Sequence, residues 1–124
     1  MAAPKRTILA IDDSLTIREL VNFVLSNAGF NVVLAEDGLE GLDALGRCAP
    51  DVIITDVNMP RLDGLSFIER ARTETQAKAT PILVLTTESG AEQKARAKAA
   101  GATGWIVKPF NPAQLIEAVR RVAP

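Results

Sequence analysis

The feature that most constrains the fold is a series of short apolar runs, each ending in residues that can carry chemistry. Such runs occupy residues 8–11, 52–54, 82–85 and 105–107. Short apolar runs bounded by polar residues are typical of strands buried on both faces of a parallel sheet. Segments with helical apolar spacing separate the runs. The chain is therefore predicted to form one doubly wound α/β domain, with five parallel strands alternating with five helices.

Helix signals fix the expected element boundaries. Ser14 is a suitable N-cap, Gly29 stands at a helix stop position, and Pro112 is tolerated in a first helical turn. Leu20 belongs to the apolar stripe of the first helix, and Leu39 shares a face with two further leucines of the second. The helix near 89–100 offers mostly alanines, so we expect it to be weakly anchored. Strands are expected near 7–11, 31–35, 52–56, 81–85 and 105–107, and helices near 15–28, 38–47, 65–73, 89–100 and 111–122.

Length and composition narrow the class of protein. A chain of 124 residues with 48% hydrophobic content is long enough for one domain with a core, and too short for two. Its net charge of −1 gives no general attraction to nucleic acid or to a membrane surface. No apolar stretch approaches the roughly 18 residues of a membrane span, and no apolar signal core precedes the first strand. The expected location is the cytoplasm.

Cysteine and histidine usage excludes several kinds of site. The single cysteine, Cys48, rules out a disulfide within the chain and a cysteine-based metal site, and it is interpreted as a small apolar filler. The chain contains no histidine, which excludes Ser-His and Cys-His nucleophile pairs and histidine metal sites. Carboxylates, lysine and threonine must therefore supply any chemistry.

Polar residues follow four of the expected strands. Asp12 and Asp13 follow the first, Asp56 the third, Thr86 the fourth and Lys108 the fifth. In parallel sheets the carboxyl ends of the strands form the ligand crevice. We therefore expect three carboxylates, a hydroxyl and an ammonium to converge at one edge.

This residue set favours phosphoryl transfer to an aspartate. Clustered carboxylates repel one another, and Mg²⁺ resolves the conflict because it prefers carboxylate, carbonyl and water ligands. Asp56 can act as a nucleophile, with Mg²⁺, Lys108 and Thr86 compensating the charge of the transferred group. Simpler interpretations remain open: an exposed turn for Asp12 and Asp13, a structural ion pair for Lys108 and an ordinary strand-end hydroxyl for Thr86.

From about residue 7 to residue 122 the chain resembles the receiver domain of two-component response regulators. The resemblance rests on the acidic pair, Asp56 with the following Asn58-Met59-Pro60 and Asp63-Gly64, Thr86, and Lys108-Pro109-Phe110. It implies a flavodoxin-like sheet in the order 2-1-3-4-5 and a cis bond before Pro109. It also implies residue roles: Mg²⁺ bound by Asp13, Asp56 and the Asn58 carbonyl with Asp12 acting through water, a switch formed by Thr86 and Trp105, and hydrolysis tuned by Asn58 and Glu88.

The same resemblance implies a signalling role. The expected protein is a stand-alone receiver and a monomer, phosphorylated by a histidine kinase and losing the phosphoryl group slowly by itself or through a phosphatase. The stretches around Asp56 and Thr86 look most like the chemotaxis branch, whose output partner is the flagellar motor switch. A phosphate sink or a relay in another two-component pathway is the alternative. Within this chain no residues remain for a DNA-binding module.

Two enzyme classes fit the sequence less well. An FMN-binding protein of this architecture would need a Ser/Thr/Gly-rich loop after the first strand, where Asp12 and Asp13 would repel a phosphate. A phosphohydrolase with an aspartyl intermediate would need a second acid two residues after Asp56. Asn58 occupies that position.

Overall fold

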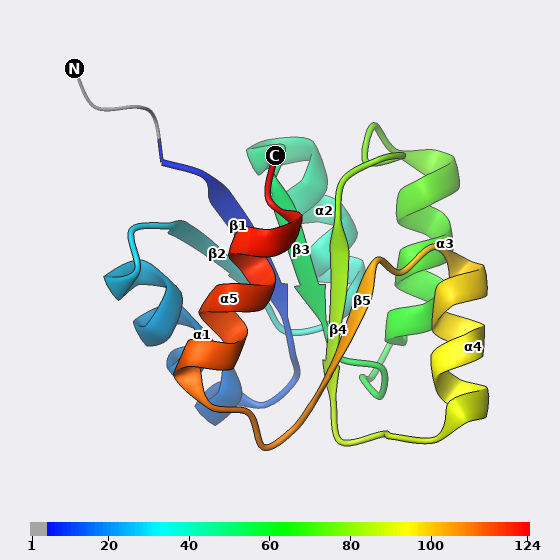
Figure 1. Ribbon diagram of the computed structural model, residues 1–124. Helices are drawn as coiled ribbons and strands as arrows, with labels where there is room; N and C mark the ends of the chain where they lie inside the picture. Colours follow the sequence, from blue (N-terminus) through cyan, green and yellow to red (C-terminus); the bar gives the residue numbers. More distant parts are fainter. Residues whose placement is uncertain (1–4) are drawn as a thin grey trace.

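The computed structural model describes residues 5–124, which form a parallel five-stranded sheet between two layers of helices (Figure 1). The strands are arranged in the order β2-β1-β3-β4-β5, and every neighbouring pair is parallel. The predicted fold class and the strand order implied by the family resemblance are both confirmed. The elements are β1 (Thr7–Ile11), α1 (Leu15–Asn27), β2 (Asn31–Ala35), α2 (Gly38–Cys48), β3 (Val52–Thr55), α3 (Gly64–Glu74), β4 (Ile82–Thr86), α4 (Ala91–Ala100), β5 (Gly104–Val107) and α5 (Pro112–Val122).

The apolar strand runs are explained by burial on both faces of the sheet. In β1, Ile8 and Ala10 pack into the cluster that contains α1 and α5, whereas Leu9 and Ile11 pack into the cluster that contains α2, α3 and α4. Successive side chains of a strand point to opposite faces, so a strand covered on both sides must be apolar throughout. No helix within residues 5–124 is both long enough and apolar enough to cross a membrane.

Side-chain caps set the starts of four helices. Ser14, Asp37, Asp63 and Asn111 each accept a hydrogen bond from a backbone N–H in the first turn of the following helix. Such caps satisfy N–H groups that have no partner within the helix. The observed boundaries lie close to the expected ones. The clearest shift is in α4, which begins at Ala91 because Gly90 is its N-cap residue.

Two residues assigned to apolar helix faces are exposed instead. Leu20 is 40% exposed and Leu39 is 41% exposed. In α2 the contact face is centred on Gly41, where an added Cβ would lie 2.5 Å from Ile11 Cδ1. This close approach turns Leu39 towards solvent. The placement of both leucines on buried faces was wrong.

The weak anchoring predicted for α4 is confirmed. Of its ten described residues, only Ala97 is buried, and its N-cap residue makes no side-chain hydrogen bond. Gly101 ends the helix in the left-handed region, with φ at 118°. A helix with so little buried surface belongs to the least stable part of a fold.

Acid pH should weaken the fold through Asp37. Its buried carboxylate accepts from the Glu40 N–H at 2.9 Å and from Arg61 Nε at 2.6 Å. Burial acts to raise the pKa of Asp37, but these hydrogen bonds and the Arg61 charge outweigh it and lower the pKa below its usual value. The ionised form is therefore favoured more in the folded protein than in the unfolded chain. The resulting stability is present above the unfolded pKa and is lost as pH falls through the folded pKa.

We expect Asp37→Asn to lower the free energy of unfolding at neutral pH by about 1 kcal/mol, a charge-assisted hydrogen bond discounted because Arg61 is half exposed. Urea denaturation at neutral pH and at several acid pH values measures the effect. The difference in free energy of unfolding between parent and variant should disappear below the usual pKa of aspartate, near 3.8. Asp43→Asn is the matched control, since Asp43 is exposed and its one ion pair within residues 5–124 is with exposed Arg47. A difference in free energy of unfolding that does not change with pH would contradict the stabilising role of the ionised Asp37 carboxylate.

Candidate functional site

Lys108 joins two carboxylates at the carboxyl edge of the sheet. Asp12 follows β1, Asp56 follows β3 and Lys108 follows β5, so three strands position the cluster (Figure 1). Lys108 Nζ donates to Asp12 Oδ2 at 2.6 Å and to Asp56 Oδ2 at 3.0 Å. The three side chains are only 7% (Asp12), 12% (Asp56) and 11% (Lys108) exposed. The convergence predicted for these strand ends is therefore found.

Asp13 adds a third carboxylate to the same place. Carboxylate oxygens of Asp12, Asp13 and Asp56 all lie within 4.8 Å of one another, and Asp13 is exposed. Among residues 5–124, Lys108 is the one cation that forms an ion pair with these carboxylates. Three acids against one paired ammonium leave negative charge that a hard divalent cation would compensate. The donor set fits such an ion.

Burial and hydrogen bonding shift two pKa values in this cluster. Burial raises the pKa of Asp12 above its usual value, and the hydrogen bonds from Lys108 and the Ser14 N–H offset this only in part. Burial acts to lower the pKa of Lys108, but its hydrogen bonds to Asp12 and Asp56 outweigh that effect and raise it. Lys108 is therefore held as an ammonium beside Asp56.

The loop after β3 fixes the Asp56 carboxylate. Asp56 Oδ1 accepts from the Val57 N–H at 2.6 Å, while Oδ2 accepts from Lys108. The loop then doubles back, and the Gly64 N–H donates to the Val57 carbonyl at 2.8 Å. A Cβ on Gly64 would lie 1.9 Å from the Asp56 carbonyl oxygen. Only glycine allows this close return of the chain.

A second group of predicted residues meets around Glu88. Asn58 Nδ2 donates to Glu88 Oε1 at 3.2 Å, and Trp105 Nε1 donates to the Glu88 carbonyl at 3.0 Å. The buried Thr86 hydroxyl accepts from the Glu88 N–H at 3.3 Å. Glu88 thus contacts all three other members of this group. Thr86 is bonded to the loop rather than to the acidic cluster, although its carbonyl accepts from the Lys108 N–H at 2.7 Å.

Comparison with known proteins identifies the family. Residues 8–120 match the family described as the response regulator receiver domain. The chain belongs to this family. It is 40% identical to the Chemotaxis protein CheY1 of Helicobacter pylori over 112 residues, covering 89% of this chain and 90% of the relative. It is 38% identical to the Chemotaxis protein CheY-3 of Vibrio cholerae over 116 residues, covering 93% of this chain and 89% of the relative.

Solved structures agree with this assignment to the receiver domain family. The fold matches the Vibrio cholerae chemotaxis protein CheY4 with a TM-score of 0.92 and 48% identity, covering 96% of this chain and 99% of that chain. It matches a putative response regulator from Chloroflexus aurantiacus with a TM-score of 0.91 and 34% identity, covering 96% and 98% of the two chains. The family recognised from the sequence is therefore confirmed.

Two further features of this structure lie beside the cluster. The Lys108–Pro109 peptide bond is cis, as the resemblance implied. Arg18, in the first half of α1, donates through Nη1 to the Asp12 carbonyl at 2.8 Å. Sequence reasoning missed Arg18. Its position, six residues after Asp12 and near the start of a helix that follows an acidic pair, was the available signal.

Proposed function

We propose that this receiver domain accepts a phosphoryl group on Asp56 from a histidine kinase and thereby changes its affinity for a partner protein. The supporting observation is the Asp56 carboxylate, aimed by Val57 and Lys108 and placed among two further acids. In the transfer, an Asp56 oxygen forms the bond to phosphorus while the phosphorus–nitrogen bond of the donor phosphohistidine breaks. The Lys108 ammonium stabilises negative charge on the transferring group.

Asp12, Asp13, Asp56 and the Asn58 carbonyl would hold Mg²⁺ in this proposal. The bound ion would neutralise charge on the phosphoryl oxygens. Asp12 already accepts from Lys108 and the Ser14 N–H. Those contacts are consistent with a role for Asp12 through a bridging water, with Asp13 and Asp56 as the direct carboxylate ligands.

The proposed phosphoryl group is lost slowly. A fast aspartyl phosphatase would need a second acid positioned as a general acid, and Asn58 stands two residues after Asp56. The Asn58 amide is bonded to the Glu88 carboxylate, so each restrains the other. We propose that this pair, rather than a catalytic acid, sets the rate of hydrolysis, and that an external phosphatase can shorten the signal.

We propose a role in chemotaxis, with the flagellar motor switch as the output partner. Sequence identity of 38–48% to proteins named as chemotaxis proteins supports it. The surface of α4, β5 and α5 is the proposed partner face, because Trp105 lies on it and α4 is weakly anchored. Binding of purified motor-switch protein tests this, with beryllofluoride as a stable phosphoryl substitute. Phosphorylation without any beryllofluoride-dependent binding would favour a phosphate sink or relay.

Mg²⁺ is expected to stabilise the folded protein. The acidic cluster is assembled only in the native state, so a bound ion shifts the folding equilibrium by mass action. At about 100 times the dissociation constant, the gain is about 2.7 kcal/mol. Thermal melting with millimolar Mg²⁺ or with EDTA measures it. Asp13→Asn should remove most of the gain, whereas Asp43→Asn should preserve it. A melting temperature indifferent to Mg²⁺ would count against the site.

Trp105 is expected to report phosphorylation by its fluorescence. In the proposed route, Thr86 turns towards the phosphoryl oxygens, and the Glu88 backbone, which contacts both Thr86 and Trp105, moves with it. Phosphorylation biases a two-state element in proportion to its differential contacts. Beryllofluoride with Mg²⁺ should change the emission of the parent, and Thr86→Ala should reduce that change. Unchanged emission while Asp56 is demonstrably modified would exclude Trp105 from the switch.

A further inference from the structure

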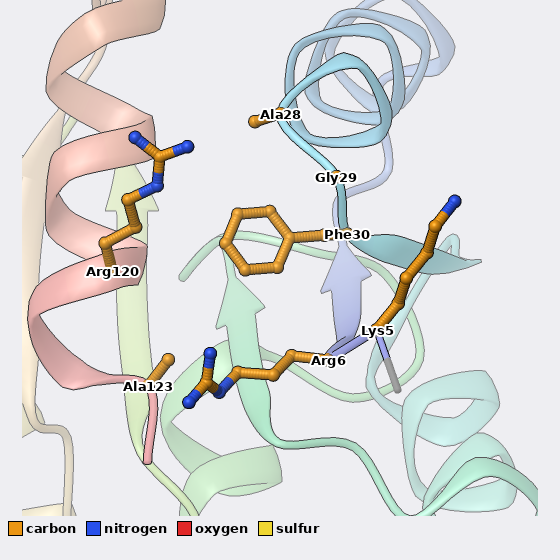
Figure 2. Close-up of a pocket in the computed structure, with 7 residues that line it drawn as sticks. All are labelled: Lys5, Arg6, Ala28, Gly29, Phe30, Arg120 and Ala123. Carbon is orange, nitrogen blue, oxygen red and sulfur yellow. The ribbon is translucent and has the colours of Figure 1, made fainter. Parts of the chain in front are cut away.

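A basic hollow lies at the amino edge of the sheet, opposite the acidic cluster. It has a volume of about 450 Å³ and lies between the start of β1 and the ends of α1 and α5 (Figure 2). Ligand sites in proteins commonly have volumes of a few hundred cubic ångströms or more. A Cβ added at Gly29, on its rim, would meet nothing within 4 Å, so the space there is open. The lining residues are Lys5, Arg6, Ala28, Gly29, Phe30, Arg120 and Ala123.

The charge of the hollow differs from that of the whole chain. The chain carries 14 basic and 15 acidic residues, yet every charged residue that lines the hollow is basic. Among residues 5–124, none of the ion pairs includes Lys5, Arg6 or Arg120. Figure 2 shows the guanidinium groups of Arg6 and Arg120 on two sides of the Phe30 ring, with Lys5 extending away from the ring. Positive charge is therefore gathered around Phe30, most of which is buried in the core.

Nearby acceptors at the end of α1 and before β3 are already occupied by backbone N–H groups. The last carbonyls of α1 already accept from the N–H groups of Ala28, Gly29 and Phe30. The nearby carboxylate of Asp51 accepts from the Thr7 N–H at 2.8 Å and does not line the hollow. Within residues 5–124 no ion pair uses the guanidinium groups of Arg6 and Arg120, so their donors can bind a ligand.

We propose that this hollow binds a small phosphate-bearing molecule with a planar apolar group, which is the chemistry of a nucleotide. The guanidinium groups bind phosphate oxygens with paired N–H donors, a geometry that suits arginine better than lysine. The planar group packs on the small side chains of Ala28 and Ala123 and on the small accessible part of Phe30, which is 8% exposed. This site is separate from the proposed phosphorylation site, since it requires neither Mg²⁺ nor Asp56.

Titration of the ¹⁵N-labelled protein with ADP, in EDTA, tests the proposal by amide chemical shifts. We expect saturable shifts at Arg6, Gly29, Phe30 and Arg120, with a dissociation constant below about 1 mM. Pyrophosphate should bind at least about tenfold more weakly, because it lacks the planar group. The same shifts should occur in Asp56→Asn, so failure of the proposed phosphorylation would leave this result intact.

Paired arginine variants locate the contact. Arg6→Gln and Arg120→Gln should each weaken ADP binding by about tenfold or more, the loss expected for a charged hydrogen bond. The matched control is Arg121→Gln, because Arg121 is adjacent on α5 but pairs with Glu117 and does not line the hollow. All three arginines are exposed, so the variants should fold, which thermal melting checks. Three results would each overturn the proposal: no saturable shifts at the hollow, equal weakening by Arg121→Gln, or pyrophosphate binding as tight as ADP.

Discussion

Replacement of Asp56 with asparagine is expected to abolish phosphorylation. Asparagine has nearly the same shape, but its amide lacks the carboxylate oxygen that would attack phosphorus. The rate of labelling by a phosphohistidine donor or by acetyl phosphate should fall by a factor on the order of 10³ or more. Lys108 retains its ion pair with Asp12, so the variant should remain folded. Phosphate-affinity electrophoresis and intact-protein mass spectrometry measure the product.

The control for this prediction is Asp43→Asn, which removes an exposed carboxylate on α2 and should be labelled like the parent. Omission of Mg²⁺ should suppress labelling of the parent as strongly as the substitution does. If Asp56→Asn were labelled as fast as the parent, the phosphoacceptor would be another residue. Peptide mapping of the labelled variant would then identify it.

Gly64→Ala is expected to destabilise the protein strongly, although it adds only one methyl group. The new Cβ would lie 1.9 Å from the Asp56 carbonyl oxygen and 2.9 Å from Val57 Cα, and neither backbone atom can move like a flexible side chain. Overpacking of this kind costs about 3 kcal/mol at the upper end of its usual range. The alternative is a shift of the loop that aims Asp56. Urea denaturation should therefore show a lower free energy of unfolding, and phosphorylation should slow.

Gly46→Ala is a matched control with the opposite expected sign. Gly46 lies within α2, and a Cβ there would meet nothing within 4 Å. Alanine should stabilise this helix by about 0.5–1 kcal/mol, because glycine loses more backbone entropy on folding. Equal changes in the free energy of unfolding for the two substitutions would show that the close approach at Gly64 does not make alanine destabilising there.

The elements were predictable from local sequence patterns, and the acidic cluster was predictable because its members directly follow strands of a parallel sheet. Apolar runs define strands, and chemistry at the carboxyl ends of parallel strands must meet at one edge. Asp12, Asp13, Asp56 and Lys108 were found in this way, with Asp56 and Lys108 separated by 52 residues in the chain. The family resemblance supplied the strand order and the cis bond, which the apolar pattern alone does not determine.

Contacts between loops were not predictable from the same pattern. The hydrogen bond between Asn58 and Glu88 depends on how two loops fold back, and no periodicity marks it. Leu39 was misplaced because the close contact of Gly41 with Ile11, and not hydrophobicity, orients α2. The basic hollow likewise joins residues from both ends of the chain. Each case needs the three-dimensional arrangement of segments that are distant in sequence.

The weak anchoring of α4 allows the sequence of this helix to vary more freely than the sequence of the core. Most substitutions at exposed sites change stability by less than about 0.5 kcal/mol. Because Ala97 alone is buried among the ten described residues of α4, mutations can accumulate along this helix without threatening the core. Duplicated copies of the gene could therefore acquire different surfaces on α4 while the residues of the proposed phosphorylation site stay the same. Specificity for different partner proteins would then evolve with little loss of folding stability.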